Sequence, residues 1–257
     1  MKMTMKTLFA GLAFAAVAVT SQASFAAGDA KAPKDVDWSF EGAFGTYDRA
    51  SAQRGLQIYK EVCAACHGLK YVAFRTLGDL GFSEAQVKAL AAQVTVPGDL
   101  DEYGEPTTRP GAPSDKFPSP FANDIAARAA MNGALPPDLS LMIKARPHGA
   151  DYVYSLLTGY DDSHEAAPGM NYNPYFAGSQ IAMAQPLYDD QVEYADGTPA
   201  TMEQMSKDVV TFLAWAAEPK LEDRHSAGYK VLAFLLVLTV LLYFSNRKVW
   251  ASMKKKD

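Results

Sequence analysis

The sequence Val62-Cys63-Ala64-Ala65-Cys66-His67 contains both cysteines of the 257-residue chain. Two thiols at this spacing can each add to one vinyl group of a single haem, and the adjacent histidine can then reach the iron. Two cysteines are too few for a disulfide scaffold or a four-cysteine zinc site. We therefore expect Cys63 and Cys66 to carry one covalently bound haem c, with His67 as an iron ligand.

The residues before the motif predict a helix that ends near the first cysteine. Thr46 or Asp48 can cap a helix over residues 49–62. Its apolar positions recur at helical spacing on one face: Ala52, Leu56, Tyr59 and Cys63. Gly55 lies beside that face and would let another helix approach closely. A thioredoxin-like C-x-x-C motif would instead begin a helix after a strand, so this pattern favours haem attachment.

The second axial position of the iron needs a ligand from elsewhere in the chain. Candidates are Met131, Met142, Met170, Met183, Met202, Met205, His148, His164 and His225. Met183 lies in an irregular apolar segment, residues 180–186, which Pro186 stiffens, and such a segment can place a thioether over the haem face. Position alone favours Met183, with Met170 and His148 as alternatives.

A second helix is expected after residue 201. Thr201 and Gln204 form a capping-box pattern, and Pro219 would end the helix. Its expected buried face consists of Met202, Met205, Val209, Phe212, Leu213 and Ala216. Phe212 and Trp215 would pack against the haem or the helix over 49–62. Between the two helices the chain is rich in turn signals, at Pro97-Gly98, Arg109-Pro110-Gly111 and Asn132-Gly133.

The start of the chain indicates export. Lys2 and Lys6 precede a short apolar run, and Ser24-Phe25-Ala26 is a small-x-small cleavage site. We expect a signal peptide at residues 1–26, and its bacterial character places the mature domain in the periplasm. The alternative is a retained N-terminal anchor.

The end of the chain indicates a membrane anchor. Residues 228–244 are mostly apolar, with Lys230 as their only charge, and would span roughly 25 Å as a helix. A basic cluster follows them, so we expect a single-pass inner-membrane protein with a cytoplasmic C-terminus. The alternative is a buried core helix. The expected organisation is a haem domain at 27–225, a transmembrane helix at 226–250 and a basic tail at 251–257.

The haem domain is strongly acidic, although the whole chain has a formal charge of only −5. Sixteen of the 24 basic residues and 28 of the 29 acidic residues fall within residues 27–225, which gives this domain −12. A field of that sign repels nucleic acid and attracts a basic partner, although acidic surfaces also serve solubility alone. We expect no nucleic-acid partner.

Several ordered motifs resemble the cytochrome c1 family. They are residues 62–67, 109–111, 127–130, 132–140, 151–160, 172–176, 196–201 and 215–219, followed by the late apolar span. The resemblance covers nearly all of the mature chain. It implies a mainly α fold: a class I cytochrome c-like haem domain with long loop insertions, plus one C-terminal transmembrane helix.

The resemblance also implies roles for single residues. Cys63 and Cys66 would carry the thioethers, and His67 and Met183 would be the iron ligands. Pro136 and Pro137 would pack beside the haem on the histidine side. Arg146 would pair with a haem propionate unless it is a solvated surface arginine, and Tyr152 would pack near the haem.

Two features of some relatives are missing from the sequence. There is no second cysteine pair before the methionine segment, so packing alone would hold that segment. There is no long acidic N-terminal extension, so dispersed carboxylates would attract cytochrome c. The candidates are Asp99, Asp101, Glu102 and Glu105 in one stretch, and Asp161, Asp162 and Glu165 in another.

The implied function is electron transfer within the bc1 complex, from a Rieske iron–sulfur protein to a soluble basic cytochrome c. Cytochrome b, the Rieske protein and membrane lipid would be partners, within a dimeric complex. The chain would be an electron-transfer subunit of a quinol–cytochrome c oxidoreductase, without catalytic residues of its own. The alternatives are an independent membrane-tethered electron shuttle and an open-site haem enzyme or sensor.

Overall fold

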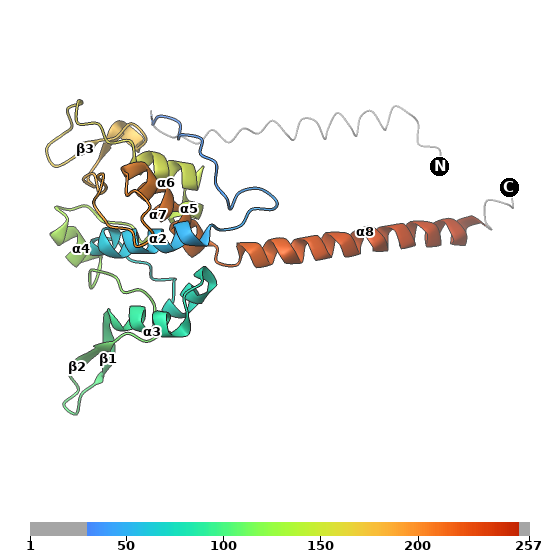
Figure 1. Ribbon diagram of the computed structural model, residues 1–257, viewed down its shortest axis with the longest axis horizontal. Coiled ribbons are helices and arrows are strands. Elements are labelled where there is room, and N and C mark those ends of the chain that lie inside the picture. The colour runs from blue at the N-terminus through green and yellow to red at the C-terminus, as the bar shows by residue number, and fades with distance from the viewer. Residues whose placement is uncertain (1–29, 252–257) are drawn as a thin grey trace.

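Helices make up most of the regular structure (Figure 1). The computed structural model describes residues 30–251, so the expected signal peptide and all but the first residue of the expected tail lie outside it. The α-helices are α2 (Arg49–Glu61), α3 (Glu84–Ala92), α4 (Asp124–Ala130), α5 (Met142–Ala145), α6 (Gly149–Leu157), α7 (Met202–Ala217) and α8 (Leu221–Ala251). The 3-10 helices are η1 (Cys63–Ala65), η2 (Phe74–Leu80) and η3 (Ala177–Ser179). The mainly α fold with one long C-terminal helix is confirmed.

The strands form two small antiparallel pairs. Strand β1 (Thr95–Leu100) pairs with β2 (Pro106–Pro110), and β3 (Asn171–Tyr172) pairs with β4 (Gln180–Ile181). The expected turn at Pro97-Gly98 is wrong, because both residues lie inside β1. The register shifts between Pro97 and Leu100, and such an irregularity tolerates proline and glycine within a strand. The described residues contain no parallel strand pair.

Helices α2 and α7 pack against each other at the centre of the core. The Asp48 carboxylate accepts hydrogen bonds from the backbone of Ala50 and Ser51, so Asp48 is the cap of α2. A Cβ atom at Gly55 would lie 2.1 Å from the carbonyl oxygen of Asp208 on α7. Only glycine therefore allows the observed approach of the two helices, as the sequence predicts.

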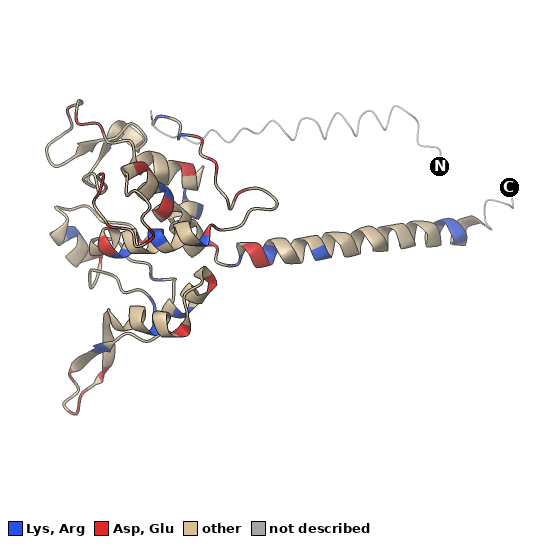
Figure 2. Ribbon diagram, viewed as in Figure 1, with Lys and Arg blue, Asp and Glu red and all other residues tan. Residues whose placement is uncertain are grey.

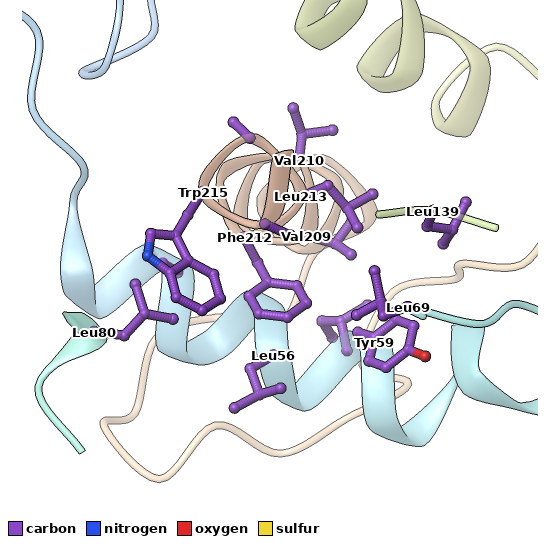
Figure 3. Packing of buried hydrophobic residues seen from close by; sticks show 14 of the residues in the cluster. Leu56, Tyr59, Leu69, Leu80, Leu139, Val209, Val210, Phe212, Leu213 and Trp215 are labelled. Atoms are coloured by element: carbon purple, nitrogen blue, oxygen red, sulfur yellow. The ribbon is translucent and has the colours of Figure 1, made fainter. Parts of the chain in front are cut away.

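Helix α7 is buried on nearly all sides. Met205 and Phe212 are fully buried, whereas Met202 is only partly buried at the first turn. The Phe212 ring lies 5.9 Å from the Tyr59 ring of α2 and 5.8 Å from Trp215, measured between centroids. Figure 3 shows these aromatic rings between the two helices, with Leu56 beside them. The aromatic mass thus packs against the helix that leads to the cysteines.

Helix α8 leaves the rest of the molecule and projects outward alone (Figure 1). It contains an 18-residue window of mean hydropathy 2.1, and none of that window is buried, which excludes the core-helix alternative. Along α8, charged residues gather near the two ends, with Lys230 between them (Figure 2). The helix begins at Leu221, before the expected span at 226–250. Its first turn is polar, and Glu222 in that turn contacts Tyr47 and Arg49 of the globular part.

Candidate haem site

The two cysteines lie where α2 gives way to a tighter turn. Val62 follows the last residue of α2, and Cys63 opens η1. The backbone nitrogens of Cys66 and His67 both donate to the carbonyl oxygen of Cys63, at 3.1 and 2.9 Å. As whole residues both cysteines are partly exposed, and neither is in a disulfide. The motif is thus folded onto itself within one turn, as attachment of both cysteines to one haem requires.

Burial controls the chemistry of the first thiol. It raises the pKa of Cys63 to about 12, and the neighbouring Cys66 adds to this effect. A reactive thioredoxin-like cysteine instead has a lowered pKa and lies at a helix N-terminus. Cys63 follows the C-terminal end of α2, so the structure does not support the thiol-redox alternative.

The imidazole of His67 has a fixed orientation. Its Nδ1 atom lies 2.7 Å from the carbonyl oxygen of Pro137. A carbonyl oxygen only accepts hydrogen bonds, so Nδ1 carries the proton and donates it. Burial also lowers the pKa of His67 and keeps the ring neutral, against the opposing effect of that hydrogen bond. Nε2 therefore retains a lone pair for a metal, the arrangement usual for ligating histidines.

A set of hydrogen bonds joins the segment after the motif to residues 137–140. The Asp138 carboxylate accepts from the backbone nitrogens of Lys70 and Ser140, at 2.9 and 3.0 Å. The backbone nitrogen of Leu139 donates to Gly68 over 2.9 Å. Sequence reasoning did not single out Asp138, although an aspartate after two prolines is a common turn signal. These bonds bring Pro137 to His67.

Met183 lies just after β4, and two side chains hold its backbone. The Tyr160 hydroxyl and the Asn171 amide donate to the Met183 carbonyl oxygen, at 3.0 and 3.3 Å. Burial raises the pKa of Tyr160, so its hydroxyl stays a donor. The expectation that packing alone holds this segment is wrong, because these hydrogen bonds also hold it. Neither Tyr160 nor Asn171 was expected from the sequence to have this role.

The remaining predicted site residues lie around these two groups. Tyr152 is partly buried on α6 and near enough to Tyr160 to contribute to its raised pKa. Arg146 is exposed and directly follows the last residue of α5. Within residues 30–251, its guanidinium donates only to the adjacent backbone, to the Ala145 carbonyl oxygen at 3.1 Å. It is therefore available to an anionic group.

The rival ligands differ in their surroundings. His148 is exposed at the start of α6. The His164 ring stacks on Tyr172 and its Nδ1 atom contacts Asp161. Met205 is fully buried within α7. Met170 is partly buried just before β3, so exposure alone does not separate it from Met183.

The donor atoms fit a c-type haem. Two thiols in one turn, an imidazole with Nε2 available and a partly exposed thioether are the set that such a group takes. Two cavities, of about 150 and 410 Å³, lie elsewhere and are not lined by Cys63, Cys66, His67 or Met183. The fit therefore rests on the donor atoms.

A model of the cytochrome c1 family matches residues 38–253. Cytochrome c1 of Rhodospirillum rubrum is 49% identical to the chain over 237 residues, which cover 85% of this chain and 87% of the relative. The chain belongs to the cytochrome c1 family. The mitochondrial cytochrome c1 haem protein of Saccharomyces cerevisiae is 47% identical over an alignment of 268 positions, gaps included. The alignment covers 99% of this chain and 87% of the relative. The mitochondrial cytochrome b-c1 complex catalytic subunit of Candida albicans is 47% identical over 242 residues, with 93% and 84% covered.

Membership of the cytochrome c1 family has direct consequences. Proteins of this family carry a covalently bound haem c. Membership supports a role in electron transport as the haem-bearing subunit of a bc1 complex. The long apolar helix α8 fits a single-pass membrane protein.

Proposed function

We propose that this chain passes one electron at a time from a Rieske iron–sulfur protein to a soluble basic c-type cytochrome. Cys63 and Cys66 would hold haem c by thioethers, and His67 and Met183 would be its axial ligands. When bound, haem c supplies a one-electron couple, whose potential a methionine ligand raises relative to a second histidine. The chain's residues bind and orient that group.

The observation that carries this proposal is the contact between His67 Nδ1 and the Pro137 oxygen, at 2.7 Å. With the proton on Nδ1, the Nε2 atom keeps a lone pair that can bind iron. The contact also fixes the direction in which that lone pair points. The contact depends on the bonds of Asp138, so the ligand orientation is part of the tertiary fold. Such partners of a ligating histidine fix its tautomer and raise its basicity.

Other residues would complete the surroundings of the haem. Arg146 would pair with a propionate, since its guanidinium has no acidic partner among the described residues. Tyr152 would pack near the haem, close to the tyrosine that holds Met183. Tyr160 and Asn171 would position the thioether by fixing the Met183 backbone.

The membrane arrangement follows from α8. We propose that α8 spans the bacterial inner membrane with Arg247 and Lys248 on the cytoplasmic side. The haem domain, residues 27–225, would then lie in the periplasm after removal of residues 1–26. Residues 226–250 would be the membrane span and 251–257 the tail. Cytochrome b and the Rieske protein would surround this chain in a dimeric complex.

The acidic surface would guide the soluble cytochrome c. Asp161, Asp162 and Glu165 directly follow Tyr160, whose hydroxyl holds Met183. The His164 ring in this stretch stacks on Tyr172 of β3, at 4.3 Å between centroids. This stretch therefore adjoins the methionine side of the site, whereas the other acidic stretch lies in the β1–β2 hairpin. We propose the 161–165 stretch as the docking patch.

Purification of the tagged chain from membranes in mild detergent tests this function. A b-type cytochrome and a Rieske protein should copurify, and quinol should reduce the haem of this chain only when both are present. An untagged strain is the control. Loss of both partners from an active preparation would favour an independent shuttle. Rapid carbon monoxide binding would instead favour an open-site haem enzyme or sensor.

A further inference from the structure

The base of α8 is joined tightly to the loop before α2. The Glu222 carboxylate accepts from the backbone nitrogen of Tyr47 at 2.9 Å and from the Arg49 guanidinium at 3.1 and 2.7 Å. The Tyr47 hydroxyl donates to the carbonyl oxygens of Ala214 and Glu218. The loop and the first turn of α8 are therefore held together, and the loop is fixed relative to the anchor.

One side chain of this loop is exposed although it is apolar. Phe44 is 83% exposed, and its ring stacks on Tyr229 of α8 with centroids 5.2 Å apart and an interplanar angle of 17°. Tyr229 itself is 38% exposed. The phenyl ring of Phe44 therefore faces outward beside α8, and the core of the domain does not cover it.

The position of Tyr229 along α8 gives its depth in the membrane. The charged residues Glu222, Asp223 and Arg224 precede it, and a mostly apolar run without a charged side chain, residues 231–244, follows Lys230. That run spans about 21 Å, so it must lie inside the hydrocarbon core of about 30 Å. Tyr229 lies about 3 Å before this run along the helix axis, and so falls at the boundary between acyl chains and headgroups, where tyrosine is commonly found. Phe44, stacked on it, falls at the same level.

We infer that Phe44 enters the boundary between lipid headgroups and acyl chains beside Tyr229, so that residues 42–45 form a second membrane contact of the haem domain. The contact is continuous with the anchor itself. A domain held at two points cannot tilt freely about the start of α8, and its height above the bilayer is fixed. This inference rests on α8 spanning the membrane and is independent of the electron-transfer partners.

Spin-label accessibility in phosphatidylcholine vesicles tests the contact. The full chain with its haem would carry a nitroxide at Phe44→Cys, and the matched control would carry it at Tyr103→Cys. Tyr103 is 82% exposed and lies in the loop between β1 and β2. Figure 1 shows that this hairpin lies away from α8. We expect the label at 44 to collide with oxygen several times more than with a water-soluble nickel chelate. The label at 103 should show the reverse.

Two results would overturn the inference. Equal nickel accessibility at 44 and 103 would place Phe44 in water, and low accessibility to both reagents at 44 would mean that protein covers it. In a second pair of variants the nitroxide is at Ala43→Cys, and Phe44 is either kept or replaced by Ser. With Phe44 in place, the label should collide with oxygen more than with the nickel chelate, and Phe44→Ser should lower this ratio at least twofold. An unchanged ratio would count against a role for the ring. Labelling at Cys63 or Cys66 would instead contradict thioether attachment, so the two failures are distinguishable.

Discussion

The imidazole of His67 and the carbonyl oxygen of Pro137 are 2.7 Å apart, although the two residues are separated by 70 positions in the sequence. The haem motif by itself therefore does not orient its histidine. Orientation requires that residues 137–140 fold against residues 67–71. This coupling means that damage to the distant segment should be visible both in stability and at the iron.

The first prediction concerns Asp138→Asn. The carboxylate accepts two backbone hydrogen bonds, and an amide in its place keeps only one acceptor oxygen. We expect the free energy of unfolding to fall by about 1–3 kcal/mol, because one backbone N–H is left without its acceptor. Urea unfolding of the haem-bearing chain, followed by circular dichroism, measures this loss.

The exposed Asp162, replaced by Ala, is the control and should change stability by less than about 0.5 kcal/mol. The ferric spectrum of Asp138→Asn should also show weaker or more heterogeneous histidine ligation. Unchanged stability together with an unchanged spectrum would mean that Asp138 does not support His67.

The second prediction concerns the close approach of α2 and α7. Gly55→Ala would place a Cβ atom 2.1 Å from the Asp208 carbonyl oxygen, and backbone cannot yield as a side-chain end can. We expect a loss of about 1–3 kcal/mol in the free energy of unfolding, as for overpacked cores. Gly78→Ala is the matched control, because nothing lies within 4 Å of its added Cβ. Equal stability of the two variants would contradict the close packing.

The sequence predicts the elements whose signals are local. Asp48 as a cap, the helix that ends before Cys63 and the start of α7 after Thr201 all depend on neighbours in the chain. Of the two hydrogen bonds of the expected capping box at Thr201, only one is present. Thr201 accepts from the Gln204 backbone, but the Gln204 amide donates to Asp208, a buried carboxylate that Arg54 also contacts. A tertiary partner determined that outcome.

The third prediction is a pH dependence. Hydrogen bonds from Thr198, and then the Arg54 guanidinium, lower the pKa of Asp196 to about 2 from an ordinary value of 3.8. The folded chain thus holds the carboxylate charged at pH values where the unfolded chain binds a proton. The stabilisation is complete above pH 4 and is lost as the pH falls toward 2.

Asp196→Asn measures this contribution by difference. The gap in unfolding free energy between the natural chain and the variant should be largest above pH 4 and should shrink steadily as the pH falls from about 4 to about 2. Denaturant unfolding at several pH values gives the gap directly. A gap that stays constant over this range would show that Asp196 does not titrate with a lowered pKa.

The fourth prediction concerns docking of the soluble cytochrome c. Asp162→Asn with Glu165→Gln should slow association several-fold at low salt, because both carboxylates are exposed in the stretch that adjoins the Met183 segment. The difference should vanish at high salt, where exposed charges are screened. Stopped-flow reduction of cytochrome c at several ionic strengths measures it.

Glu102→Gln with Glu105→Gln is the matched control in the β1–β2 hairpin. These two side chains are exposed, and the turn at the hairpin tip depends on the Asp101 carboxylate, which stays in place. The control pair should have a smaller effect than the 161–165 pair. A larger effect in the hairpin would move the docking patch there.

The candidate site was predictable only in part. A five-residue motif predicts Cys63, Cys66 and His67. The irregular apolar segment favours Met183 but leaves Met170 and His148 as alternatives, and the family resemblance is what selects Met183. Tyr160 and Asn171 could not be found in this way, because their roles consist of hydrogen bonds to the Met183 backbone. A tyrosine that donates to a distant carbonyl has no sequence pattern that distinguishes it from a tyrosine that only packs.

The fifth prediction tests the central proposal, that His67 and Met183 ligate a covalently bound haem c. The measurement is a potentiometric titration of the full chain, with the ferric methionine–iron charge-transfer band recorded alongside. In Met183→Leu we expect the band to disappear and the reduction potential to fall by on the order of 0.1 V or more, since axial ligands shift potentials over about 0.8 V. The haem should stay attached, and Met170→Leu, the matched control, should keep both band and potential. A Met183→Leu variant that keeps both would contradict the ligand assignment.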